Sequence, residues 1–234
     1  MICFAHRGAS GRAPENTLLA VKTALAMGAA WIELDVFAVE NELVVFHDSR
    51  LERTTSGSGD ITRSTLAYLR SLDAGKGEKI PFLWEVLNTV AGDAGINIEL
   101  KGANTAAMVA SLIESYVQKE LFHEDQFLVS SFNHQELQNF SRLAPAIRTG
   151  ANLSDLPLHN ARFAEELAVY SLHVHKDFVT QTFVEDAHRR GFKVFVFTIN
   201  HREDLISMIS IGVDGIFTNY PELCAICDTP GLTS

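Results

Sequence analysis

The sequence predicts an α/β protein folded as a (β/α)8 barrel, the TIM-barrel fold, and two observations lead to this prediction. Short apolar runs with strand character alternate along the chain with segments whose apolar residues recur at helical spacing. This alternation is typical of a parallel sheet in which a helix follows each strand. The chain has 234 residues, 47% of them hydrophobic, which is enough for a barrel to form undivided. We therefore expect a single barrel domain over residues 1–234.

Eight segments are expected to form the strands of the barrel, because each is a short apolar run bounded by polar residues or glycine. They are Ile2–His6, Trp31–Val36, Asn97–Leu100, Gln126–Ser130, Arg148–Ala151, Tyr170–Val174, Val194–Thr198 and Gly215–Thr218. The segments between them, such as Leu18–Leu25 and Met108–Val117, have apolar residues three to four positions apart. These segments are expected to be helices that cover the outside of the sheet.

The first helix shows the local signals most clearly. Asn16 stands where the helix needs an N-cap acceptor, and Glu15 is explained most simply as an acid near the helix start. Gly28 follows Met27 at the position where a left-handed residue ends a helix at least cost.

One further strand-like run, Leu43–Phe46, interrupts the alternation. A parallel crossover needs about a dozen residues or more, and this run follows Val36 too closely. It should therefore form an antiparallel hairpin with a turn at Glu40–Glu42, which brings His47 back towards the strand ends. Residues 49–80 are rich in Ser, Thr, Gly and charge, and we expect them to be a capping insertion.

Composition excludes several classes of partner. The formal net charge is −10 and the isoelectric point is near 5.3, so nucleic acid and anionic membrane surfaces would be repelled at long range. The first residues have no basic region and no long apolar stretch, so we expect no secretory signal, and no apolar run is long enough for stable membrane insertion. We expect a cytoplasmic protein with a small-molecule partner, and the sequence contains no signal for its oligomeric state.

The cysteines give little sign of a specific role. Cys3, Cys224 and Cys227 are an odd and sparse set, and the pair at 224 and 227 has no second pair to complete a zinc site. Ordinary packing of the C-terminal tail explains them better than a redox or metal site.

Three carboxylates are expected to meet at one end of the barrel. Glu33 and Asp35 are two residues apart near the end of one strand, so they point to the same face, and Glu99 ends the next barrel strand. Barrels place their active sites at the carboxyl ends of the strands. Three acids in a small volume repel one another, and a divalent cation removes this repulsion. The sequence therefore predicts a site for one divalent cation, Mg²⁺ or Ca²⁺, with Glu33, Asp35 and Glu99 as ligands.

Basic side chains are available around the predicted metal site. His6 ends the first strand and His47 follows the hairpin, so the two imidazoles could divide the acid and base work of phosphodiester cleavage. Arg7 and Lys101 are placed to hold a phosphate, and Gly8 allows a tight turn beneath it. The charges of three carboxylates, a dication, these two cations and a phosphodiester monoanion sum to zero, which favours the assignment.

The ordered motifs of the chain resemble those of the glycerophosphodiester phosphodiesterases. They are His6-Arg7-Gly8, Pro14-Glu15-Asn16-Thr17, Glu33-Leu34-Asp35-Val36, Val45-Phe46-His47-Asp48, Ile98-Glu99-Leu100-Lys101 and Asp214-Gly215-Ile216-Phe217-Thr218-Asn219. The resemblance implies hydrolysis of a glycerophosphodiester to sn-glycerol 3-phosphate and an alcohol. It also implies that His6 and His47 are the acid and base, that the three carboxylates bind metal, and that Arg7 and Lys101 contact the phosphate.

The aromatic residues near the predicted site depart from the family pattern. Phe197-Thr198-Ile199-Asn200 stands where the family commonly has Trp-Thr-Val-Asn, and Phe82 and Trp84 replace smaller or polar residues. Phe197 and Phe132 are candidates for the pocket wall, although core packing explains Phe132 nearly as well. A changed aromatic wall affects which alcohol fits more than whether the reaction occurs.

Two rival functions remain open at this level. One is a related barrel phosphodiesterase that acts on lysophospholipids, and the other is a noncatalytic barrel that binds phosphate. His173 and His175 share one face of a strand and could bind a metal ion, but we expect no acidic partner near them to complete such a site. His123, His134, His159, His188 and His201 are expected to be solvated.

Overall fold

Eight parallel strands close into a barrel with helices outside it, which confirms the predicted fold class. The computed structural model describes residues 1–227. The barrel strands are β1 (Ile2–His6), β2 (Trp31–Val39), β4 (Gly95–Leu100), β5 (Phe127–Ser131), β6 (Arg148–Leu153), β7 (Ser171–His175), β8 (Lys193–Phe197) and β9 (Gly215–Thr218). Each pairs with the next in parallel, and pairing of β1 with both β2 and β9 closes the ring.

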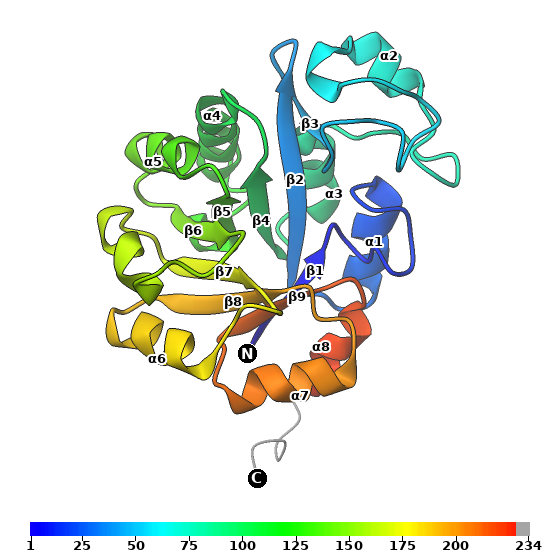
Figure 1. Ribbon diagram of the computed structural model, residues 1–234. Coiled ribbons are helices and arrows are strands. Elements are labelled where there is room, and N and C mark those ends of the chain that lie inside the picture. The colour runs from blue at the N-terminus through cyan, green and yellow to red at the C-terminus, as the bar shows by residue number, and fades with distance from the viewer. Residues whose placement is uncertain (228–234) are drawn as a thin grey trace.

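Helices follow the strands around the outside, as Figure 1 shows. They are α1 (Leu18–Ala26), α3 (Leu83–Val90), α4 (Thr105–Gln118), α5 (His134–Leu143), α6 (Gln181–Arg189), α7 (Arg202–Ser210) and α8 (Cys224–Cys227). Short 3-10 helices complete the connections: η2 (Glu124–Gln126), η3 (Asn160–Glu166) and η4 (Pro221–Leu223). Two clusters of buried apolar residues fill the space between strands and helices. Within the described residues, none of the helices combines the length and the apolar character that crossing a membrane requires.

The N-cap of the first helix lies one residue later than expected. Thr17, not Asn16, is the N-cap, and its hydroxyl accepts the backbone N–H of Ala20 at 3.2 Å. Asn16 has a left-handed backbone (φ 57°), and its side chain turns towards β2. A capping signal and a ligand-supporting side chain look alike in sequence, because both are short polar residues before an apolar stripe. Gly28 ends the helix with φ 79°, as predicted.

The predicted hairpin is present. β3 (Glu42–Val45) pairs antiparallel with β2, and the turn residues Glu40 and Asn41 both have positive φ. This is the conformation of a tight hairpin turn. The pairing extends β2 to Val39, beyond the expected end at Val36, because its outer part gains hydrogen bonds from β3.

Residues 49–80 lie beside this hairpin and contain η1 (Ile61–Arg63) and α2 (Leu66–Ser71). Their apolar side chains, including Leu51, Ile61 and Leu69, pack against the outer part of the hairpin in a cluster of their own. The insertion is therefore fixed to β2 and β3, close to the strand ends where His47 lies.

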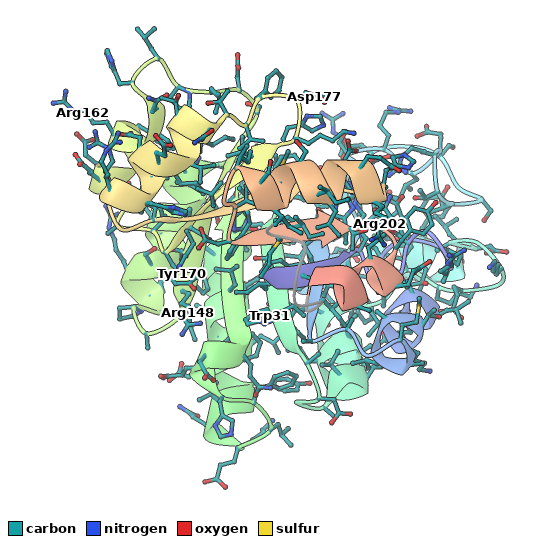
Figure 2. All side chains as sticks on the ribbon, turned by 90° about the horizontal axis from the view of Figure 1, so that it is seen from below. Trp31, Arg148, Arg162, Tyr170, Asp177 and Arg202 are labelled. Carbon is teal, nitrogen blue, oxygen red and sulfur yellow. A yellow bond between two sulfur atoms is a disulfide. The ribbon has the colours of Figure 1, made fainter. Side chains whose placement is uncertain are left out.

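Apolar side chains fill the interior of the barrel at its lower end, which is the end where the amino ends of the strands lie. Phe4, Leu128, Phe195 and Phe217 form a buried apolar layer there. Trp31, Arg148 and Tyr170, which are labelled in Figure 2, lie close to this layer. The Arg148 guanidinium lies 5.0 Å from the centre of the Tyr170 ring. Polar side chains occupy the interior above the apolar layer, towards the carboxyl ends of the strands.

The cysteine expectation was wrong for one pair. Cys3, in β1, and Cys224, at the start of α8, form a disulfide between residues 221 positions apart. Spacing along the chain could not predict this pairing, because it depends on the closure of the barrel. The side chain of Cys227 lies outside the described part of the chain.

Candidate active site

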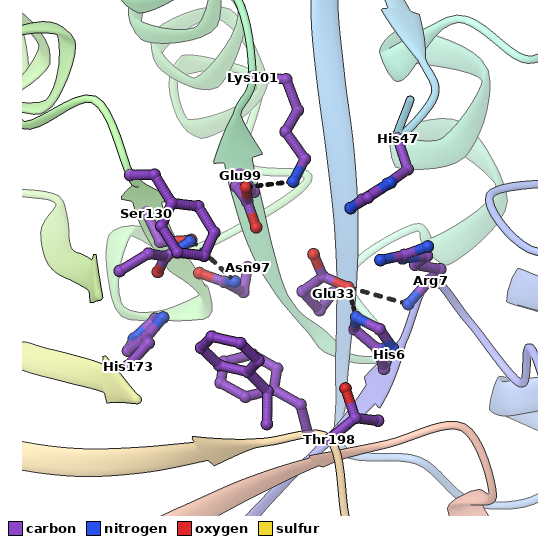
Figure 3. Close-up of a pocket in the computed structure, with 14 residues that line it drawn as sticks. His6, Arg7, Glu33, His47, Asn97, Glu99, Lys101, Ser130, His173 and Thr198 are labelled. Carbon is purple, nitrogen blue, oxygen red and sulfur yellow. Dashed lines mark hydrogen bonds and ion pairs between the residues drawn. The ribbon is translucent and has the colours of Figure 1, made fainter. Parts of the chain in front are cut away.

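A cavity of about 120 Å³ opens at the carboxyl ends of the strands and gathers most of the predicted site residues. Figure 3 shows the labelled side chains pointing into it from different strands. Its lining includes the following predicted residues: His6, Arg7, Glu33, His47, Glu99, Lys101, Phe132 and Phe197. Asp35 lies just behind the lining and is 1% exposed.

The three carboxylates converge. Each of Glu33, Asp35 and Glu99 offers an oxygen, and these three oxygens lie within 4.8 Å of one another. Strand register explains the convergence, because Asp35 of β2 is opposite Glu99 of β4, and Glu33 is on the same face of β2. All three are at least nine-tenths buried. Close, buried carboxylate oxygens are the donor set that suits Mg²⁺ or Ca²⁺, so the residues fit a hard divalent cation.

The electrostatics of this cluster show an excess of negative charge. Burial, followed by repulsion from Asp35, raises the pKa of both Glu33 and Glu99. Burial alone would also raise the pKa of Asp35, but the nearby Lys101 and Arg7 lower it below its ordinary value. Asp35 is thus the carboxylate held charged by the protein itself. A dication would favour the charged form of the other two.

Two cations flank the carboxylates. Lys101 Nζ lies 2.5 Å from Glu99 Oε1 and 3.2 Å from Asp35 Oδ1. Arg7 Nε lies 3.4 Å from Asp35 Oδ2, and the Arg7 backbone N–H donates to Glu33 Oε2 at 2.9 Å. Arg7 has φ 57° and precedes Gly8 at φ 75°, which turns the chain beneath the cavity. Both cations keep part of their surface in the cavity, where they can meet an anion.

The two imidazoles are held in the same way by different partners. His6 Nδ1 is 2.7 Å from Asn219 Oδ1, and His47 Nδ1 is 2.5 Å from Asp48 Oδ1. Because both partners are oxygen acceptors, the neutral imidazoles carry their proton on Nδ1. The other ring nitrogen, Nε2, then faces the cavity, where His6 Nε2 lies 4.0 Å from Glu33 Oε2.

Burial favours the neutral form of both imidazoles. Desolvation, with a further contribution from Arg7, lowers the pKa of His6 to about 4. Desolvation also lowers the pKa of His47, although the charge of Asp35 and the hydrogen bond that His47 donates to Asp48 oppose this shift. An uncharged Nε2 can accept a proton and a protonated Nε2 can donate one, so the geometry provides two acid-base nitrogens beside the carboxylates.

Sequence reasoning missed a polar network behind these groups. Arg53, from the insertion, binds Asp48 with Nε and Nη2 at 2.5 and 3.0 Å, and binds Glu15 with Nη1 and Nη2 at 2.8 and 2.7 Å. Glu15 also accepts from Arg7 Nη1 at 2.8 Å. The expectation that Glu15 is only a helix-start acid was therefore wrong. Its partners lie in other elements, so no local pattern could reveal them.

Asn16 also belongs to the site rather than to the helix cap. It is 3% exposed, and its side-chain N–H donates to Asp35 Oδ2 at 2.9 Å. The Asp35 backbone N–H in turn points at Asn16 Oδ1, at 3.4 Å. Asn16 thereby fixes the orientation of the carboxylate that the cations hold charged.

The aromatic candidates form one wall of the cavity. Phe132 and Phe197 pack edge to face with ring centres 6.1 Å apart, and Lys101 Nζ lies 5.6 Å from the centre of the Phe132 ring. Phe132 is 43% exposed, so it stands at the mouth and is not a core residue.

The other histidines lie in varied settings. His173 is fully buried in the cavity lining, whereas His175 is partly exposed and pairs with Asp177 at 3.5 Å, so the expectation of no acidic partner was wrong for His175. His134 is half-buried and its Nε2 meets the Asn152 carbonyl oxygen at 3.0 Å, so solvation was the wrong expectation for it. The exposed residues are His123, His159, His188 and His201.

Comparison with known proteins places this site in a family. Residues 6–223 match the model of the glycerophosphoryl diester phosphodiesterase family. A glycerophosphodiester phosphodiesterase from Caldanaerobacter subterraneus is 36% identical over 232 residues, which cover 94% of this chain and 95% of the relative. Another from Bacillus subtilis is 33% identical and covers 95% of this chain and 85% of its own length.

A solved structure agrees in fold as well as in sequence. The Oleispira antarctica phosphodiesterase, solved with the product sn-glycerol-3-phosphate, superposes with a TM-score of 0.88 at 34% identity and covers 98% of this chain and 97% of its own. Agreement over nearly the full length, together with the fold predicted from the motifs, shows that this chain belongs to the glycerophosphoryl diester phosphodiesterase family.

Proposed function

We propose that this protein hydrolyses glycerophosphodiesters to sn-glycerol 3-phosphate and an alcohol with the help of one divalent cation. The observation that carries the proposal is the meeting of Glu33, Asp35 and Glu99 within 4.8 Å, beside two imidazoles, in a member of this family. The relative from Oleispira antarctica holds sn-glycerol-3-phosphate, which supports the nature of the product.

The residues present suit each demand of the reaction. Arg7 and Lys101 supply positive charge for the phosphodiester, as expected for phosphate contacts. The three carboxylates would hold Mg²⁺ or Ca²⁺, which supplies charge stabilisation at a nonbridging phosphate oxygen when bound. Positive groups that are shielded from water, such as Arg7 and Lys101 here, stabilise the negative charge that develops on the phosphate during the reaction.

Their partners support different roles for the two histidines. The Nδ1 of His47 bonds to a carboxylate, Asp48, which stabilises a protonated His47, whereas the Nδ1 of His6 bonds to the neutral amide of Asn219. His6 Nε2 would therefore take the proton of the attacking oxygen, and His47 Nε2 would give its proton to the leaving alkoxide. The P–O bond to the attacking oxygen forms as the bond to the leaving oxygen breaks. Water or a neighbouring substrate hydroxyl can supply the attacking oxygen.

Assay of the purified protein with glycerophosphocholine tests this proposal. Choline and glycerol 3-phosphate should appear in equal amounts, a chelator should stop the reaction, and Mg²⁺ or Ca²⁺ should restore it. His6→Ala and His47→Ala should each lower turnover at least about a hundredfold. The control is His123→Ala, which removes an exposed imidazole outside the cavity. Near-normal turnover in both active-site variants would contradict the assignment, and phosphate binding without turnover in the parent protein would indicate a noncatalytic barrel.

The aromatic mouth supports a second candidate substrate. Phe132, at the mouth, is 43% exposed, which is high for an aromatic side chain, and apolar surface at a pocket mouth suits an acyl chain. The second candidate is therefore cleavage of lysophospholipids at the same phosphodiester. Parallel assays with glycerophosphocholine and lysophosphatidylcholine distinguish the two by the ratio of kcat/KM.

A further inference from the structure

A layer of polar side chains lies inside the barrel next to the carboxylates. Four neighbouring strands each contribute one inward-facing polar residue, and all four line the same cavity: Asn97, Ser130, Asn152 and His173. Each is at most 5% exposed. Strand register places Asn97 opposite Glu33, so this polar layer adjoins the proposed metal site.

Two acceptor oxygens in the polar layer have no hydrogen-bond partner among the described residues. They are Oδ1 of Asn97, which is 1% exposed, and Oδ1 of Asn152, which is 5% exposed. The Asn97 amide nitrogen is held by Ser130 Oγ at 3.1 Å, and Figure 3 shows the Asn97 side chain directed into the cavity. Buried amide oxygens in folded proteins are nearly always paired, so these two mark the position of a hydrogen donor.

No donor among the described residues reaches these two oxygens. Below it lies the apolar layer formed by Phe4, Leu128, Phe195 and Phe217. His173 Nε2 is already shared with Ser171 Oγ at 2.9 Å, and its ring packs against Phe195 and Phe217. The donor must therefore come from whatever enters through the mouth of the cavity.

We propose that the polar layer binds the free hydroxyls of the glycerol moiety, which donate to Asn97 Oδ1 and Asn152 Oδ1. This inference rests on the proposed function, because it assigns the glycerol half of the substrate to the cavity floor. The alcohol half then leaves past Phe132 at the mouth. A hydroxyl group is a donor of the right size for a single amide oxygen, and it has no charge that the apolar layer below would destabilise. The polar layer thereby selects glycerol-containing esters over esters without hydroxyls.

Binding of two product-sized phosphates to the metal-loaded protein tests the selection without requiring turnover. Glycerol 3-phosphate and n-propyl phosphate share the phosphate and the three-carbon chain, but the second has no hydroxyls. A site built to bind hydroxyls rejects an analogue that lacks them, and we expect a dissociation constant for n-propyl phosphate larger by about tenfold or more. Calorimetry measures both constants, and competitive inhibition gives an independent value. Equal affinities would overturn the proposal and would mean that water occupies the polar layer.

Variants at Asn152 locate the effect. Asn152→Leu has a similar volume and removes the acceptor, so the ratio of the two dissociation constants should fall towards one. Asn152→Asp keeps an acceptor oxygen and should retain discrimination, which guards against a folding defect in the leucine variant. Asn139→Leu, on the partly exposed side of α5, is the matched control. An unchanged ratio in Asn152→Leu would contradict the proposal even if the parent protein discriminates.

The assignment of the polar layer and the proposed activity can fail independently of each other. If the parent protein discriminates between the two phosphates but does not hydrolyse glycerophosphocholine, the proposed activity fails while the polar layer remains a hydroxyl-binding site. If it hydrolyses glycerophosphocholine but binds both phosphates equally, the activity stands and the assignment of the polar layer is wrong.

Discussion

The carboxylate of Asp48 lies directly behind the imidazole of His47, with 2.5 Å between Asp48 Oδ1 and His47 Nδ1. The hydrogen bond from Arg53 is the main reason why the pKa of Asp48 falls to about 2. Asp48 is therefore charged across the whole neutral range. A permanent negative charge at this position favours the protonated form of His47 and fixes the direction of its Nε2.

Replacing Asp48 with Asn should shift the pH profile of the reaction. The amide still accepts from Nδ1 but has no charge, so the pKa of His47, already lowered by burial, should fall further. An acid must be protonated to act, and its activity is lost as pH rises through its pKa. The alkaline limb of kcat/KM should therefore move to lower pH, and Asp125→Asn, at an exposed position, should leave it unchanged. Movement of the acidic limb instead would assign the base role to His47.

Removing Arg53 should impair catalysis although Arg53 does not line the cavity. Its guanidinium binds both Asp48, which lies behind His47, and Glu15, which in turn binds Arg7. We expect Arg53→Ala to lower kcat by roughly tenfold or more, because supporting contacts of this kind orient the groups in contact with substrate. The side chain is 49% exposed, so added guanidinium should restore part of the activity.

Two further variants separate positioning by Arg53 from a general effect of charge. Arg53→Lys keeps the charge but cannot bind both carboxylates with paired donors, so it should recover little activity. Arg50→Ala removes a 67% exposed arginine of the same insertion that pairs with Glu52, and it should behave as the parent protein does. Equal losses in Arg50→Ala and Arg53→Ala, or no rescue by guanidinium, would argue against a positioning role.

Divalent cations should stabilise the fold through the three carboxylates. At about one hundred times the dissociation constant, a ligand that binds only the folded state adds roughly 2.7 kcal/mol, which corresponds to a Tm increase of about 5–10 °C for a chain of this size. Thermal unfolding with and without Mg²⁺ or Ca²⁺ measures this increase. Glu99→Gln should abolish most of it, whereas Glu114→Gln, on the outside of α4, should not. A cation response that survives in Glu99→Gln would place the cation elsewhere.

Reduction of the disulfide between Cys3 and Cys224 should lower stability more than activity. The bond closes a very long loop, and such bonds typically add about 2–4 kcal/mol. Reductant should therefore lower Tm by roughly 5–10 °C. Cys3 and His6 lie at opposite ends of β1, so the site geometry should change little. Cys3→Ala should have this lower Tm even without reductant, and adding reductant should not lower it further. A Tm of the parent protein that does not change with reductant would contradict this prediction.

Sequence reasoning located the strands because the signals for them are local. Buried runs such as Ile2–His6 and Gly215–Thr218 have the predicted bounds in the structure, since polar residues or turns limit them on both sides. β2 is longer than expected because its end depends on pairing with β3, which is a contact between strands. Asn16 was misassigned for the same reason, because only the approach of β2 gives its side chain a partner other than the helix.

The sequence by itself determined the fold class, the family motifs and the expectation that three acids and two histidines share one end of a barrel, because side-chain alternation and strand direction are encoded locally. Only the tertiary structure decided which side chains hold these acids and histidines in place. Three sets of contacts join segments that are far apart in the chain. They are the ion pairs of Arg53 with Asp48 and Glu15, the disulfide between Cys3 and Cys224, and the hydrogen bond between Asn97 and Ser130 in the polar layer. Closure of the barrel brings these segments together, and no local pattern specifies which distant side chains will meet.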